Sequence, residues 1–99
     1  MPRKPRPARA SKLLVQMRQN PKGDWRIEQL ETVARGHDVN VRRGRRSHVI
    51  FEHPRSSQAL SIPAHRPVKP VYVRRFVSLV ELVEGLRGHA IARGDVDEL

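Results

Sequence analysis

The sequence predicts an α+β fold in which helices pack on one face of a three-stranded antiparallel sheet. Apolar residues recur with the helical period of about 3.6 in the first third of the chain, with period 2 in the middle, and with the helical period again in the last third. The links between these segments are short and no internal repeat is present. An α-α-β-β-β-α order of this kind closes most simply as one small domain.

Composition limits what such a domain can be. The chain has 99 residues and is 37% hydrophobic, which allows one modest core. It has no cysteine, which excludes disulfides and thiolate metal sites and fits a reducing compartment. No apolar run approaches the roughly 20 residues of a membrane span, and the N-terminus lacks the apolar region of a secretory signal. We therefore expect a cytoplasmic protein with no membrane partner.

The charge indicates an anionic partner. Twenty Lys and Arg residues oppose ten Asp and Glu residues, so the formal net charge is +10. Nucleic acid is the best candidate, because phosphate contacts release counterions and so stabilise binding to a basic surface. An anionic membrane is a weaker one, because no basic amphipathic helix is evident.

The N-terminal part predicts an arm and two helices. Residues 1–10 hold three prolines, four basic residues and no acid, which is typical of a disordered basic arm. A helix follows from Lys12 to Gln19, with Ser11 as its N-cap. A second helix is expected from Trp25 to about Arg35, with Asp24 as its cap and Gly36 after its end. Trp25 is expected to pack at the first turn, with nucleobase stacking as the alternative.

Three short strands are expected next. Alternation predicts strands over residues 38–42, 48–52 and 59–63, the last at a sheet edge because of its prolines. If the apolar positions of these strands face the helices, Arg42 and His48 share the opposite, open face. The apolar positions are Val39, Val41, Val49, Phe51, Leu60 and Ile62.

The last helix is expected from Val71 to about Leu86, stopped by Gly85 and Gly88. Residues 11–88 would then form the domain, and residues 89–99 a flexible acidic tail. Lys69 and Arg74 stand near the start of this helix, where cations oppose the macrodipole. Their placement predicts an anion site, since phosphates bind at helix N-termini; solvated charges that tolerate the position are the alternative.

The densest basic cluster lies between the first two strands. It consists of Arg42, Arg43, Arg45 and Arg46, which surround Gly44 and precede His48. Such a turn would hold an anionic ligand beside a group that exchanges a proton near neutral pH. We expect these arginines, with Lys69 and Arg74, to contact RNA.

Several motifs resemble a known family. They are Asn20-Pro21-Lys22, the helix Trp25–Gly36, the run Ser47–Pro54 (SHVIFEHP), the run Ser61–Arg66 (SIPAHR) and Lys69-Pro70 before Val73-Arg74. Together they resemble the HicA family of toxin–antitoxin modules, over Leu13 to about Leu86. The resemblance implies a fold like the double-stranded-RNA-binding domain (dsRBD), mRNA cleavage and inhibition by a HicB-like antitoxin. The family's catalytic histidine, in a Gly-Ser-His motif, corresponds to His48. Two departures are Arg46 in place of the glycine and Val49 where a second histidine is common.

The chemistry needs few groups. RNA supplies its own nucleophile, the 2′-OH, so a histidine with a pKa near 6.5 can move the proton while arginine and lysine stabilise the phosphorane. No metal or cofactor is needed. His48 is the predicted catalytic residue, and His53, His65 or water is left open as the second proton carrier. His53, before a proline, is interpreted as a turn-stabilising residue, and His37 as a helix-end residue.

Two alternatives remain. The chain is either a metal-independent endoribonuclease toxin or a non-catalytic dsRBD-like module that binds RNA without cutting it. A DNA-binding protein ranks last, because no helix-turn-helix pattern is present.

Overall fold

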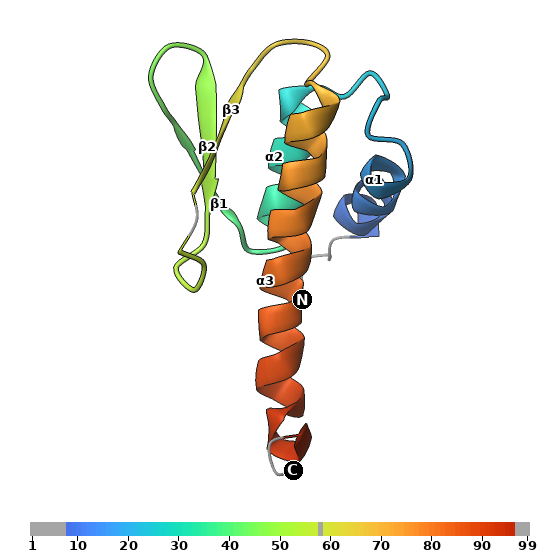
Figure 1. Ribbon diagram of the computed structural model, residues 1–99, viewed down its shortest axis with the longest axis vertical. Helices are drawn as coiled ribbons and strands as arrows, with labels where there is room; N and C mark the ends of the chain where they lie inside the picture. The colour runs from blue at the N-terminus through green and yellow to red at the C-terminus, as the bar shows by residue number, and fades with distance from the viewer. Residues whose placement is uncertain (1–7, 58, 97–99) are drawn as a thin grey trace, which may run out of the picture.

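The structure, a computed structural model, describes residues 8–57 and 59–96, with side chains described as far as residue 85. Its elements follow the predicted order (Figure 1). They are α1 (Ala8–Gln19), α2 (Ile27–Gly36), β1 (Asn40–Arg43), β2 (His48–Glu52), β3 (Leu60–Pro63) and α3 (Pro70–Val96). The α+β class, the three-stranded antiparallel sheet and the α-α-β-β-β-α order are confirmed.

The strands form one sheet in the order β1-β2-β3, so β2 is central and β3 lies at an edge, as its prolines predicted. Val41 pairs with Phe51, and Val49 pairs with Ile62. Directly paired residues point to the same face, so these four side chains form one apolar surface. Val49, Phe51 and Ile62 are fully buried under the helices.

The core lies between this surface and the helices. In Figure 1, α2 and α3 lie beside the sheet, and α1 lies on their far side. Phe51 of β2 meets Phe76 of α3 edge to face, with ring centroids 4.9 Å apart and planes inclined at 64°. The other face of the sheet has no helix over it in the described part of the chain (Figure 1). The fully buried larger side chains are Phe51, Phe76, Met17, Leu30, Ile62, Val33, Val49, Val68, Val73, Val80 and Val83.

Helix α1 starts earlier than predicted. Residues 8–10, assigned to the basic arm, form its first turn, and Ala10 is 2% exposed. Ala10 lies four residues before Leu14 and seven before Met17, so it continues their buried stripe. Alanine is also the best helix former, which the proline-rich composition of the arm obscured. The rest of the predicted arm, residues 1–7, lies outside the described residues.

Helix α2 begins two residues later than predicted, and Asp24 does not cap it. Its N-cap is Arg26, whose backbone N–H donates to the Gln29 side chain at 2.9 Å. Trp25 lies just before the helix, is 8% exposed, and donates its indole N–H to the Asn20 carbonyl. Its packing role is confirmed, and its buried ring has no exposed face on which a nucleobase could stack.

Helix α3 continues to Val96, past the predicted stop near Leu86 and through most of the predicted tail. Gly85 keeps a helical backbone rather than the left-handed conformation by which glycine ends a helix. Glycine inside a helix lowers stability by only about 0.5–1 kcal/mol, so its presence alone was a weak stop signal. Residues 97–99 of the tail lie outside the described part. No helix among the described residues is both long and apolar enough to cross a membrane.

Candidate nucleic-acid interface

The open face of the sheet carries the predicted pair. Arg42 lies opposite Ile50, and His48 is two residues before Ile50 on the same strand. Residues two apart on a strand share a face, so Arg42 and His48 both point away from the helices. The expectation drawn from alternation is therefore confirmed by the register. Glu52 shares this face, and Pro63 lies opposite His48 on β3.

His48 is fixed through its backbone and free at its ring. Its carbonyl accepts the Gly44 N–H at 2.9 Å, and its N–H donates to the Arg45 carbonyl at 3.0 Å. These bonds close the β1–β2 turn directly before the histidine. The side chain is half-buried, and its imidazole has no hydrogen-bond partner among the described residues. Both ring nitrogens are thus available to a ligand on the open face.

The β1–β2 turn presents two exposed cations. Arg45 and Arg46 are exposed, and neither side chain has an ion-pair partner in the described ranges. Arg46 has φ 58°, in the left-handed region that favours glycine. The turn therefore holds a long cationic side chain in a conformation that glycine adopts most readily. A Cβ on Gly44 would lie 2.9 Å from Ile50 Cδ1, so a larger residue there would require the Ile50 side chain to move.

The other two arginines of the cluster are held by carboxylates. Arg42 Nε donates to Glu52 Oε2 at 2.6 Å, and this hydrogen bond raises the pKa of Arg42. Arg43 lies opposite Val49 and therefore points to the helix side. There its Nη1 is 3.2 Å from Glu31 Oε2, an ion pair without hydrogen-bond geometry.

Glu31 is the most informative residue that the sequence analysis missed. It is 6% exposed in α2 and also contacts Arg35 at 3.7 Å. A buried carboxylate needs partners, so Arg43 is structural. The periodic stripe of α2 had assigned only apolar residues to the buried face.

Lys69 and Arg74 do not form one site with His48, because Arg74 lies on the helix side of the sheet. Lys69 directly precedes α3, and its carbonyl accepts the N–H groups of Tyr72 and Val73. The loop that carries it crosses the same end of the molecule as the β1–β2 turn (Figure 1). Arg74 instead lines grooves on the helix side, with Leu60 and with Met17. Arg74 is therefore separated from His48 by the sheet.

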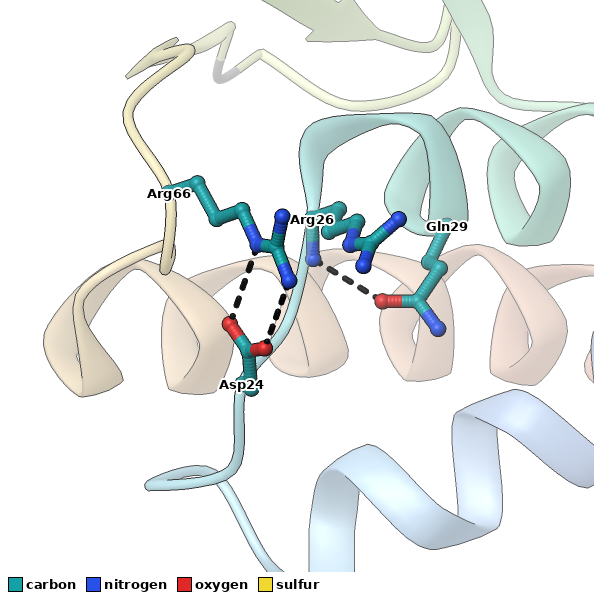
Figure 2. Close-up of polar contacts among 4 residues, drawn as sticks. All are labelled: Asp24, Arg26, Gln29 and Arg66. Atoms are coloured by element: carbon teal, nitrogen blue, oxygen red, sulfur yellow. Dashed lines mark hydrogen bonds and ion pairs between the residues drawn. The ribbon is translucent and has the colours of Figure 1, made fainter.

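The β3–α3 loop is tied to both neighbours. The Ala64 N–H donates to the Ser47 carbonyl at 2.8 Å, which continues the β2–β3 ladder beside the arginine turn. Arg66 binds Asp24 through Nη2 at 3.1 Å and Nε at 3.5 Å (Figure 2). The hydrogen bond from Arg66 lowers the pKa of Asp24, and the same bond raises the pKa of Arg66. Asp24 thus orients the loop that carries His65.

The remaining histidines differ in role. His53 accepts the Arg55 N–H at its Nδ1, which confirms its interpretation as a turn-stabilising residue. His65 is exposed. His37 follows the end of α2 as expected, but it is only 8% exposed, and its Nδ1 lies 2.5 Å from Glu84 Oε2 of α3. It therefore joins two helices and does not reach the open face.

No family model, no characterised protein and no solved structure matched this chain in the three comparisons made. The residues and their geometry are consequently the basis for any functional conclusion.

Proposed function

We propose that this protein is a metal-independent endoribonuclease that cleaves mRNA, the toxin of a HicA-like type II toxin–antitoxin pair with a dsRBD-like fold. One observation carries the proposal. His48, the position that the motif resemblance marks as catalytic, has a free imidazole on an open sheet face and directly follows a turn with two unpaired arginines. A HicB-like antitoxin and a cytoplasmic location belong to the same proposal.

The proposed chemistry uses the RNA 2′-OH as nucleophile. His48 removes its proton as general base, or protonates the leaving 5′ oxygen as general acid. Arg45 and Arg46 hold the scissile phosphate and stabilise the charge that develops on it, with Lys69 at the same end of the fold. Glu52 competes with a phosphate for Arg42, because its carboxylate already binds Arg42 Nε. Arg43 has no part in this step, because it pairs with Glu31. Arg74 has none either, because it lies on the helix side of the sheet.

Geometry favours His65 over His53 as the second proton carrier. Pro63 pairs with His48, and His65 is two residues beyond Pro63, where the ladder continues through Ala64 and Ser47. His53 lies five residues along from His48, about 16 Å in an extended strand, and its Nδ1 is already bonded. A two-histidine mechanism would therefore use His48 and His65, one as base and the other as acid.

The second candidate function is a non-catalytic RNA-binding module. Arg46 favours it, because a long side chain at φ 58° stands where the motif has glycine and restricts how closely an RNA backbone approaches the turn. Such a module would bind RNA with a steep salt dependence and leave it intact.

The deciding experiment is cleavage of a long single-stranded RNA by the purified chain in excess EDTA. We expect fragments from the wild type and none from His48→Ala. His53→Ala is the matched control, because it removes a histidine at the opposite end of β2, outside the proposed site, and it should still cut. Equal cutting by wild type and His48→Ala would overturn the assignment of His48. Binding without cutting by all variants would establish the second candidate.

A further inference from the structure

A groove of about 700 Å³ runs between the edge strand β3 and helix α3. Leu60 of the strand and Ala59, directly before it, contribute to its walls. Helix α3 contributes Arg74, Arg75, Ser78, Leu79 and Leu82. The groove lies on the helix side of the sheet, whereas His48 points to the open face. It is therefore a second surface, distinct from the proposed RNA site.

The groove runs along a stripe of α3 formed by Val71, Arg75, Ser78 and Leu82, whose first and last residues are exposed apolar side chains. Val71 is 44% exposed and Leu82 is 48% exposed, and in the described part of the chain only Val15 is a comparable exposed apolar side chain. Positions 71, 75, 78 and 82 fall on one side of an α-helix, so Val71 and Leu82 continue the groove wall along α3. Exposed apolar area concentrated along one groove is typical of a docking site.

The adjoining strand edge has unused hydrogen-bonding groups. Ala64 donates toward β2, and Ile62 pairs with Val49. Successive residues of a strand direct their backbone groups to opposite sides, so the N–H and C=O of Ser61 point away from β2. Neighbouring strands lie about 4.8 Å apart, so a fourth strand beside β3 would lie next to this stripe of α3.

Charge decides between possible occupants. Arg75 is exposed and has no ion-pair partner within the described ranges, and Arg74 lies next to it. A second copy of this chain, at +10, would bring the same arginines against each other. A nucleic acid would satisfy the arginines but would leave the leucines against its charged backbone. An acidic polypeptide whose α3-facing side chains include both apolar residues and carboxylates satisfies the edge, the stripe and the arginines together.

We propose that the groove between β3 and α3 binds an acidic polypeptide segment as a fourth strand. Backbone groups of the segment pair with Ser61. On the side of the segment that faces α3, apolar side chains pack on Leu79 and Leu82, and a carboxylate two residues along contacts Arg75. This mode is strand addition to an exposed edge. It does not rest on the ribonuclease proposal, because it involves neither His48 nor the β1–β2 turn.

The test uses the full chain and a short capped peptide of repeating Val-Thr-Glu-Thr, which presents valine and glutamate in turn on one face of a strand. Titration is followed by the backbone amide signals of the protein in two-dimensional NMR. We expect shifts concentrated at Ser61, Ser78 and Leu82, and none at Arg45 or His48. A control peptide with proline in place of each threonine keeps the charge and the valines but lacks half of the N–H groups, and should shift these signals little.

Variants at exposed positions assign the site. Arg75→Glu and Leu82→Ser should each weaken peptide binding by about ten-fold or more. Their matched controls on α1, Lys12→Glu and Val15→Ser, change an exposed cation and an exposed valine outside the groove, and should bind as the wild type does. His48→Ala should also bind the peptide normally, whatever its effect on RNA.

Three outcomes would overturn the proposal. They are no groove shifts at millimolar peptide, the same groove shifts with a short RNA but not with the peptide, and concentration-dependent shifts of Ser61 in the protein alone. The second outcome would assign the groove to nucleic acid, and the third to a second copy of the chain.

Discussion

Arg42 of β1 and Glu52 of β2 form a hydrogen-bonded ion pair on the open face of the sheet, with Arg42 Nε 2.6 Å from Glu52 Oε2. Both residues share that face with His48. The pair is half exposed, so a phosphate can compete with the carboxylate for Arg42. Glu52 therefore reduces the cationic character of the surface on which we propose that RNA lies.

Glu52→Gln should strengthen RNA binding and make it more salt-dependent. The amide no longer holds the guanidinium by charge, so Arg42 gains one phosphate contact. The slope of log K against log salt should steepen by about 0.7 for a single-stranded RNA. Electrophoretic mobility-shift titrations over a series of KCl concentrations measure it. Glu28→Gln, an exposed glutamate on α2, is the control and should leave the slope unchanged apart from a small general charge effect. An unchanged slope for Glu52→Gln would contradict the pairing argument.

Arg46→Gly should stabilise the fold while it weakens RNA binding. The left-handed φ of 58° is unfavourable for arginine by about 1–2 kcal/mol, and glycine loses about 0.5–1 kcal/mol more entropy on folding. The unfolding free energy should therefore rise by up to about 1 kcal/mol, as measured by urea denaturation.

Arg45→Gly is the matched control for this change, because it removes a cation from the same turn at a residue with ordinary φ. It should lower the unfolding free energy by about 0.5–1 kcal/mol. Both variants should lose about one phosphate contact in the salt slope. Equal stability changes in the two variants would contradict a left-handed conformation at Arg46.

Asp24→Asn should destabilise the protein at neutral pH and not in strong acid. Arg66 lowers the pKa of Asp24 in the folded state below its usual value of 3.8, so the folded state releases this proton more readily than the unfolded state. The pair therefore stabilises the fold at pH above 3.8, and its contribution is lost as the pH falls through the lower folded pKa.

Thermal unfolding of wild type and Asp24→Asn at pH 7 and pH 2 tests this relationship. The difference in melting temperature should be small, because both side chains are exposed, and it should shrink at pH 2 and in 1 M salt. Arg66→Gln should reproduce the loss at pH 7, and adding Asp24→Asn to it should change little. A pH-independent difference would point to a local effect at the start of α2.

The spacing of apolar residues and the positions of glycine and proline were sufficient to predict the fold class, the element order and the faces of the strands. The alternation of Val49 and Phe51 with His48 fixed which side of β2 would be buried, because a one-residue shift would expose both. The bounds of helices were less predictable. Gly85 and the prolines before Ala8 are local signals that a helix stops or cannot form. The proline signal was outweighed at Ala8–Ala10, because Ala10 is buried against the rest of the fold.

The sequence predicted which cations lie near the candidate site, but not which carboxylates pair with them. Arg42 and Arg43 are neighbours in a basic run, but one meets Glu52 and the other meets Glu31, ten or more residues away. Such pairings depend on strand register and on the packing of α2 against β1. The register Arg43–Val49 could have placed Arg43 on the helix side once the turn length was known. Glu31 lies four residues after Ile27 and three before Ala34, so helical periodicity placed it on the buried face, and only its charge argued against burial. No sequence signal paired His37 with Glu84.

Phe76→Leu should destabilise the protein by more than loss of apolar area predicts, because Phe76 meets Phe51 edge to face at 4.9 Å. Edge-to-face pairs contribute about 0.5–1.5 kcal/mol beyond burial. A double-mutant cycle with Phe51→Leu isolates this coupling from the cost of each smaller side chain. Leu82→Ala, at a position 48% exposed on the same helix, is the control and should change the unfolding free energy by about 0.5 kcal/mol or less. A coupling near zero in urea denaturation would mean that the two rings fill the core independently, and that the sheet and α3 are held together by apolar area alone.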